Sequence, residues 1–287
     1  MTPDLYLDHC GCIVNDLASA AARWERLGFN LMPLSRQRGA VPGREGFHPW
    51  ATANRCVILH NTYLELIGTV DAAAFNPWSR FISQSEGLHI LALRCDDAQA
   101  AYAGLSARTD AFLPPVLRER ILDVDGEPRT MRFRNIFSRD EVWPEARYLV
   151  IEHQTPEYLW QPCYQEHENG ACELVAVTFV ADDPVSLLPR MEALGAQVVS
   201  QGASGFSAKL AGGSVHVMHS ASCADAYAHG ALPGMHGITV SVQDLHFTLE
   251  LIADRGIVMR TGDQGAYIGH EDTGGFVLHF VQDGAIS

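Results

Sequence analysis

The sequence predicts an α+β protein of four βαβββ modules, and the main reason is an internal repeat. In each module an apolar strand-like run precedes an amphipathic helix, and three further strand-like runs follow that helix. The first strands are expected near residues 5–14, 88–95, 173–180 and 236–242. A length of 287 residues exceeds that of a usual single domain. We therefore expect two domains of two modules each, at residues 1–168 and 169–287.

The first module has the clearest helix signals. Asp16 is the expected N-cap of a helix from about Leu17 to Leu27, and Gly28 follows its C-terminus. The Gly/Pro-rich stretch from Arg36 to Trp50 is interpreted as a loop, of a length that often serves as a lid over a binding site. The remaining strands of this module are expected near residues 29–34, 55–59 and 62–68.

The other modules follow the same order. In the second, a helix over 97–105 precedes a hairpin over 116–137, where Asp125-Gly126 favours a type I′ turn. Later helices are expected from Asp182 or Asp183 to Leu194, and from Leu245 to Asp254. The remaining strands are expected near residues 147–153, 197–200, 206–210, 214–219, 257–260, 265–270 and 276–281.

The composition excludes some partners and indicates a compartment. A formal net charge of −14 argues against nucleic acid or an anionic membrane, because both attract a basic surface. The seven cysteines include no C-x-x-C pair, which favours reduced thiols and a cytoplasmic location. We see no secretory signal and no apolar run near the roughly 20 residues that span a bilayer. A small molecule is the expected partner.

Matching polar residues occur in the first two modules. His9 and His89 each precede an aspartate by seven residues, and the last strand of each module carries a glutamate, Glu65 or Glu152. Since side chains two apart share a strand face, each group stands among mainly apolar neighbours. A carboxylate buried there needs a partner. Two imidazoles and two carboxylates suit one divalent ion, which could be Zn²⁺, Ni²⁺, Mn²⁺ or Fe²⁺.

Short motifs along nearly the whole chain carry a resemblance to known proteins. They are Leu7-Asp8-His9, Asn15-Asp16-Leu17, Leu27-Gly28-Phe29, Thr52-Ala53-Asn54-Arg55, Tyr63-Leu64-Glu65-Leu66, and the stretches 152–157, 167–171 and 272–280. The chain resembles the vicinal oxygen chelate superfamily, which includes glyoxalase I, extradiol dioxygenases, fosfomycin-resistance enzymes and bleomycin-binding proteins. Its first half is similar to the glyoxalase-like subgroup.

This resemblance implies two paired, cup-shaped mixed sheets with flanking helices, the first around a metal ion held by His9, Glu65, His89 and Glu152. The ion would bind neighbouring oxygens of a substrate and stabilise an enolate-like intermediate, with Glu65 or Glu152 as general base. We therefore expect a metal-dependent lyase or isomerase, and by resemblance alone a homodimer. An Fe²⁺ extradiol-type dioxygenase is one alternative. A non-catalytic protein that sequesters a small molecule is the other.

Several residues near the expected site have open assignments. His153 is the alternative to Glu152, as a ligand or a substrate contact, because a register shift of one residue exchanges the two strand faces. Arg36 and Arg38 would attract an anionic substrate from the loop, or lie in solvent. Tyr63 would hydrogen-bond the substrate, or pack at the rim.

Arg132 and Arg134 share a strand face and could clamp a substrate carboxylate. Ion pairs with Glu119, Asp123 or Glu127 are the slightly preferred alternative for them. The second half departs from the ligand pattern, since Val175 stands where the first module has His9. Its alternative metal ligands are His216, His236 and His279. We interpret this half as a degenerate domain that is structural or shapes the substrate site.

Overall fold

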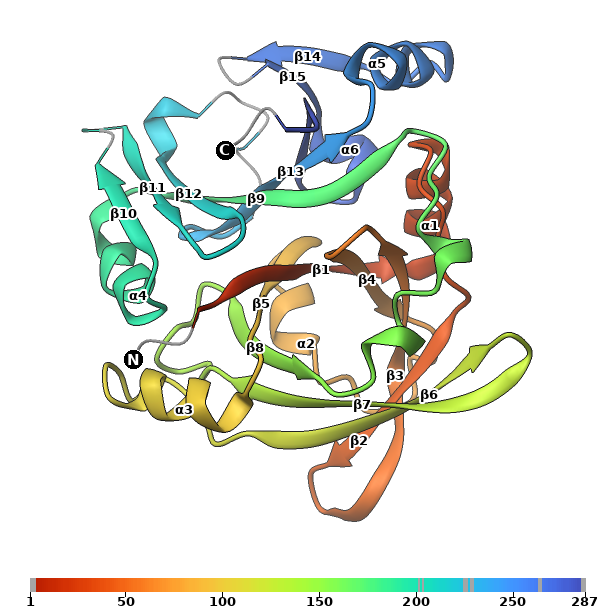
Figure 1. Ribbon diagram of the computed structural model, residues 1–287, viewed down its shortest axis with the longest axis vertical. Helices are drawn as coiled ribbons and strands as arrows, with labels where there is room; N and C mark the ends of the chain where they lie inside the picture. The colour runs from red at the N-terminus through yellow and green to blue at the C-terminus, as the bar shows by residue number, and fades with distance from the viewer. Residues whose placement is uncertain are drawn as a thin grey trace.

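The computed structural model describes residues 4–284 except 201, 203, 224–226, 228, 229, 263 and 264. In this part of the chain, two eight-stranded mixed sheets lie one above the other (Figure 1). Each sheet consists of two βαβββ units, so the predicted fold class is confirmed.

The first sheet has the strand order β2-β3-β4-β1-β5-β8-β7-β6. The antiparallel pair β1 (Tyr6–Asp16) and β5 (Gly87–Arg94) lies at its centre. Each runs parallel to the last strand of its own module, β4 (Tyr63–Thr69) or β8 (Arg147–His153). The outer strands are β2 (Ser35–Val41), β3 (Arg44–Ile58), β6 (Val116–Val124) and β7 (Glu127–Phe137). The helices are α1 (Leu17–Arg26), α2 (Ser79–Ile82) and α3 (Ala98–Ser106).

The second sheet repeats this arrangement with the order β10-β11-β12-β9-β13-β16-β15-β14. Its strands are β9 (Ala171–Ala181), β10 (Gln197–Ser200), β11 (Gly205–Lys209), β12 (Ser214–His219), β13 (Gly234–Val242), β14 (Met259–Gly262), β15 (Gly265–Ile268) and β16 (Val277–Gln282). The helices are α4 (Leu188–Ala193), α5 (Leu245–Asp254) and α6 (His270–Thr273).

The helix starts and the tight hairpin agree with the sequence signals. The Asp16 and Asp97 side chains accept backbone N–H groups at the starts of α1 and α3, and Asp183 and Asp244 cap the corresponding helices of the second half. The turn between β6 and β7 has positive φ angles at Asp125 (54°) and Gly126 (81°), as a type I′ turn requires.

Two expectations about the first module were wrong. Residues 29–34 form no strand, and the expected loop from Arg36 to Trp50 is instead a long hairpin of β2 and β3. One of its glycines, Gly39, has a packing role, because a Cβ there would lie 2.0 Å from the indole of Trp50. The helix expected to reach Leu194 from Asp182 or Asp183 begins as a 3₁₀ turn, Pro184–Leu187, before α4.

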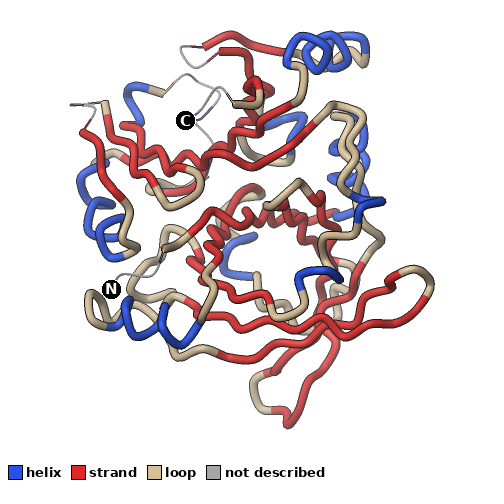
Figure 2. The backbone as a smooth tube through the Cα atoms, in the orientation of Figure 1, coloured by secondary structure: helices blue, strands red, loops and turns tan. Residues whose placement is uncertain are grey.

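The two sheets share one core. The convex sides of β1 and β5 lie against β9 and β13, and one hydrophobic cluster contains residues of both sheets. Leu7 also donates its backbone N–H to the carbonyl of Gly212, at 2.7 Å. The concave side of the first sheet faces away from this core, where the strands curl into an almost closed ring (Figure 2). Among the described residues, no helix is long and apolar enough to cross a membrane.

Candidate functional site

The concave side of the first sheet encloses a cavity of about 970 Å³, to which all eight strands contribute residues. We call this cavity the cup. Apolar side chains from β5, β7 and β8 line one wall, including Ile90, Phe133 and Ile151. His9 of β1, Tyr63 and Glu65 of β4 and His153 of β8 are the polar groups on its floor.

A β-bulge brings the side chains of two adjacent residues of β1 together beneath the cup floor. Leu7 pairs with Leu93 and His9 pairs with Ala92, so Asp8 has no partner on β5. Strand alternation alone would point Asp8 and His9 to opposite faces. With the bulge, Asp8 Oδ1 lies 2.6 Å from His9 Nδ1.

Asp8 links two imidazoles. Its carboxylate is completely buried, and its Oδ2 lies 3.1 Å from Nε2 of His153. Burial by itself raises the pKa of Asp8, but the charges and hydrogen bonds of His153 and His9 outweigh it and hold that pKa well below its usual range. The ionised carboxylate accepts the Nδ1 proton of His9, which leaves Nε2 of that ring toward the cup.

Glu65 faces His9 across the cup floor. Asn54 donates to its Oε1, while its Oε2 lies 4.0 Å from Nε2 of His9. The Tyr63 ring stacks on His9 with centroids 4.1 Å apart, and its hydroxyl lies 3.4 Å from Nε2. Burial, with Asp8 and Glu65 nearby, raises the pKa of Tyr63 well above its ordinary value, so the phenol stays a neutral donor. The floor therefore offers a carboxylate, an imidazole and a phenol within reach of one substrate.

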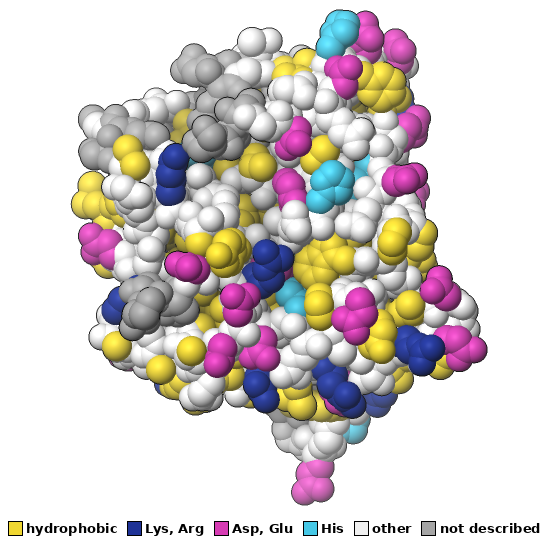
Figure 3. Space-filling model, in the orientation of Figure 1, with side chains coloured by type: hydrophobic (Ala, Val, Ile, Leu, Met, Phe, Trp, Pro, Cys, Tyr) yellow, Lys and Arg dark blue, Asp and Glu magenta, His cyan; other side chains and the backbone are white. Residues whose placement is uncertain are grey.

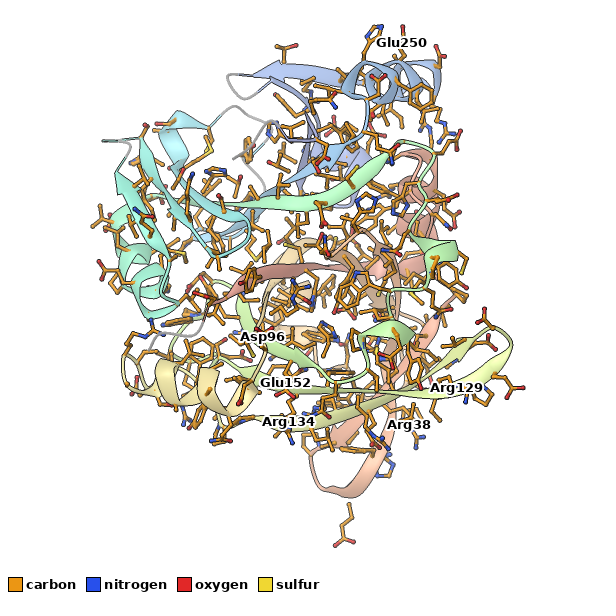
Figure 4. The ribbon with its side chains drawn as sticks, viewed as in Figure 1. Arg38, Asp96, Arg129, Arg134, Glu152 and Glu250 are labelled. Carbon is orange, nitrogen blue, oxygen red and sulfur yellow. The ribbon has the colours of Figure 1, made fainter. Side chains whose placement is uncertain are left out.

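The structure does not bring His89 and Glu152 to this floor. His89 Nε2 lies 2.9 Å from the carbonyl of Ser85, and its ring packs on Phe81. Glu152 is on the opposite face of β8, beside the start of α3, where it accepts the N–H of Ala98 at 2.8 Å (Figure 4). His153, the alternative to Glu152, is the β8 residue that lines the cup.

Strand register explains where the second histidine lies. Gly11 pairs with Ile90 and Cys12 with Leu88, so His89 is the bulged residue of β5, as Asp8 is of β1. Counting seven residues back from the two observed N-caps, Asp16 and Asp97, gives His9 in one module and Ile90 in the other.

The same alignment extends to the last strands. Gly11 pairs with Glu65 in the first module, and the equivalent Ala92 pairs with Leu149 in the second. At the positions equivalent to His9 and Glu65, the second module therefore carries Ile90 and Leu149, whose hydrocarbon side chains cannot ligate an ion. Of the four predicted ligands, the structure brings His9 and Glu65 together and places His89 and Glu152 elsewhere. Within the described residues, no group of three or more His, Cys, Asp or Glu side chains is placed to hold a metal ion.

The alternative histidines of the second half do not form a comparable site. His216 lies 2.8 Å from the Ser207 hydroxyl, and His279 Nε2 lies 2.6 Å from the Tyr227 hydroxyl. Burial, with the charge of His216, lowers the pKa of His279 to about 4. His236 approaches the Ala231 carbonyl at 3.3 Å. These side chains are partnered within the second half of the chain, and none of them lines the cup.

The arginines are divided between the cup and the outer surface. Arg36 and Arg38 line the cup mouth, but from strand β2 rather than from the expected loop. Arg132 points outward, and its Nε lies 2.8 Å from Glu119 Oε1, an ion pair that was the predicted alternative to clamping a substrate carboxylate. Arg134 Nη1 lies 3.6 Å from Glu152 Oε2. Sequence reasoning did not select Asp8 and Asn54, nor Arg118 and Arg120 on the inner face of β6. Strand alternation could have identified Arg118 and Arg120, because it places both on the strand face opposite to that of Glu119.

Comparisons with known proteins agree with this fold. A family model described as a glyoxalase-like domain matches residues 7–195. Among curated proteins, none is a significant match. A hypothetical protein from Staphylococcus aureus has a TM-score of 0.66 at 11% identity, over 97% of this chain and 99% of that chain.

Two further solved structures have named activities. A Mn(II)-bound glyoxalase from Novosphingobium aromaticivorans has a TM-score of 0.55 at 11% identity, over 99% of this chain and 83% of its own. A mutant of 4-hydroxymandelate synthase from Streptomyces coelicolor has a TM-score of 0.55 at 13% identity, over 90% of this chain and 77% of its own. At such low identity these likenesses support the fold alone.

Proposed function

Because the chain belongs to the glyoxalase-like domain family of the vicinal oxygen chelate superfamily, we propose that its first half is the active half of an enzyme. The reaction is a proton transfer beside a carbonyl group of a small substrate, of the lyase or isomerase type. The observation that carries this proposal is the Asp8–His9 pair facing Glu65 on the floor of a large cavity.

Glu65 is the general base in this proposal. Its Oε1 is held by Asn54 and its Oε2 is directed to the cup. Oε2 accepts a proton from the carbon next to the substrate carbonyl, the C–H electron pair becomes the C=C π bond of an enolate, and the carbonyl π pair moves onto oxygen. In an isomerase that acts on an α-hydroxy carbonyl compound, the α-hydroxyl proton moves to the former carbonyl oxygen, and the same carboxyl returns its proton to the former carbonyl carbon. In a lyase, the carboxyl gives its proton to a group that leaves from the carbon next to the deprotonated one.

His9 stabilises the charge that develops on the carbonyl oxygen of the same substrate. Protonated His9 donates from Nε2 to the developing enolate oxygen, and the Tyr63 hydroxyl is a second donor beside it. Asp8 stabilises the imidazolium through Nδ1, because its buried carboxylate stays ionised. Apolar walls reduce the dielectric around these groups, which strengthens each of these interactions.

Deuterium exchange tests the proton transfer. Pyruvate, phenylpyruvate and 3-hydroxybutanone are incubated with the protein in D₂O, and loss of the α-proton signal is followed by NMR. We expect exchange by the wild type, and a rate about 10²–10⁴-fold lower in Glu65→Gln. Glu250→Gln, on α5 far from the cup (Figure 4), is the matched control and should keep the wild-type rate. Binding of these compounds without exchange would instead support the sequestering protein.

The predicted divalent ion stays a separate prediction for the same floor. Its support is that two of the predicted ligands, His9 and Glu65, lie together on the floor with Nε2 and Oε2 4.0 Å apart; they would hold the ion, which would act as a Lewis acid on the substrate oxygens. Metal analysis of the wild type and His9→Ala decides it. One equivalent of ion that is lost in the variant supports a metal-dependent enzyme, and oxygen uptake with catechol would then favour the dioxygenase. Less than a tenth of an equivalent in the wild type would contradict it.

A further inference from the structure

The cup is cationic although the chain is acidic. The formal net charge is −14, yet six arginines line the cup against four acidic side chains. Basic side chains are also concentrated in the lower half of the face drawn in Figure 3, over the first sheet. A cleft with low-dielectric walls focuses such a field and attracts ligands of opposite charge.

Only some of these arginines are available to a ligand. Arg147 pairs with Asp140 at 2.6 Å, while Arg38 and Arg139 donate to backbone carbonyls. For Arg36, Arg118 and Arg120 there is no hydrogen bond or ion pair with any residue that the structure describes. The Arg36 side chain is exposed at the outer rim, whereas Arg118 and Arg120 are half-buried on the inner face of β6.

Their positions relative to the floor follow from the hairpin register. Arg118 is opposite Phe133 and Arg120 is opposite Met131, so both share the inner face of the β6–β7 hairpin. The Arg118 guanidinium lies 5.8 Å from the centre of the Phe137 ring. The Arg120 charge opposes the increase in the pKa of Tyr63 and Cys56 that burial causes, which places it within electrostatic range of the floor.

Arg118 has no acidic partner among the residues that the structure describes. Partial burial lowers the pKa of this half-buried guanidinium, and no acidic group offsets that effect. An oxyanion that enters the cup can therefore take the place of the missing partner. Two guanidinium groups on one strand face, about 7 Å apart in backbone spacing, can each donate to an oxyanion between them.

We propose that Arg118 and Arg120 bind the oxyanion group of the substrate, so that the cup takes a small organic anion with an apolar body. The apolar body would lie against Phe133, Phe137 and Ile151, with the reacting carbon toward Glu65. This inference rests on the proposed function, because it names the substrate class for the same site. It assigns the anion to the inner face of the hairpin rather than to Arg132 and Arg134.

Matched pairs of probes test the charge preference. Benzoate, phenylacetate and 3-phenylpropionate are each compared with the corresponding amide by isothermal titration calorimetry. Phenylphosphonate is added to distinguish a phosphonate-type oxyanion from a carboxylate. We expect at least one acid to bind ten-fold or more tightly than its amide. The preference should fall below three-fold in the double variant Arg118→Gln/Arg120→Gln.

Controls separate this inference from folding and from the proposed function. Arg129→Gln and Arg132→Gln, on the same hairpin but outside the cup, should keep the wild-type preference. Arg118→Lys/Arg120→Lys should keep part of it, which identifies charge as the cause if the glutamine variant is unstable. Glu65→Gln should lose deuterium exchange but keep acid binding, so the two proposals fail separately. Equal affinity for acid and amide in every pair, or a preference that survives in the glutamine variant, would overturn the inference.

Discussion

At the scale of single residues, Asp8 organises the site. It is a completely buried carboxylate whose two oxygens contact Nδ1 of His9 and Nε2 of His153. Its folded-state pKa lies below the ordinary value of 3.8. A group of this kind stabilises the fold above its unfolded-state pKa, and that stabilisation is lost as the pH falls toward the folded-state pKa.

Asp8→Asn should therefore reduce stability in a pH-dependent way. We expect the unfolding free energy at pH 7 to fall by about 1–3 kcal/mol, because two imidazoles lose their charged acceptor. The difference from the wild type should narrow as the pH falls below about 4, because the unfolded wild-type chain takes up a proton there while folded Asp8 stays ionised. Urea denaturation at pH 7, 5 and 3.5 measures this. Asp254→Asn on exposed α5 is the control, and a difference that is constant with pH would contradict the argument.

A one-residue register shift limits what the sequence predicts about the site. His9 and Glu65 were identified from local patterns, and the structure brings them together. His89 was matched to His9 by counting from Asp96, whereas the helix cap is Asp97. Glu152 was matched to Glu65 as the glutamate on the last strand of its module, with His153, one residue away, as the alternative. Single-residue spacing decides which strand face a side chain occupies. Asp8 lies beside His9 and His153 because of a bulge between β1 and β5, which depends on contacts far apart in the sequence.

At the scale of elements, the β2–β3 hairpin is the main departure from the expected fold. Its Gly and Pro content indicated a loop, but the chain continues the sheet and forms one side of the cup mouth. The reason lies in a tertiary contact that composition does not reveal. Gly39 leaves space on β2 for the indole of Trp50 on β3, and Trp50 lines the cup.

Gly39→Ala should disturb that contact. The added Cβ would lie 2.0 Å from the Trp50 ring, so the indole must move. We expect a loss of about 1–3 kcal/mol of stability and a changed near-ultraviolet circular dichroism signal. Gly43→Ala, at the tip where a Cβ meets no atom within 4 Å, should cost only the strain of its positive φ and leave the spectrum unchanged. Identical spectra for both variants would contradict this packing role.

At the scale of the whole molecule, the four-module repeat could be predicted from the sequence because the signals that mark each module are local. Helix caps, the Asp125-Gly126 turn and apolar strands gave four modules without knowledge of their packing. The sequence did not reveal that the two sheets pack through their convex sides. In that arrangement the second half covers the back of β1 and β5, which carry His9 and Ile90 on their other face. The second half can therefore support the site although its histidines depart from the ligand pattern of the first half.

This shared core predicts one cooperative unfolding transition for both halves. Trp24 of α1 is almost fully buried, packs edge-on against Phe276 with ring centres 6.0 Å apart, and donates its indole N–H to the carbonyl of Thr273 at 2.6 Å. Trp24→Ala would leave a cavity and an unpaired carbonyl between the halves. We expect a loss of about 3–5 kcal/mol, with a single calorimetric transition shifted as a whole.

Trp50→Ala is the matched control, since it removes an indole from the cup mouth rather than from the contact between the halves. It should shift the transition less than Trp24→Ala does, while weakening the binding of apolar anions in the cup. Two separate transitions in the wild type, or a shift in Trp24→Ala confined to one half by hydrogen exchange, would contradict a shared core. A single transition that shifts as a whole in Trp24→Ala would mean that the second half contributes directly to the stability of the strands that carry His9 and Glu65.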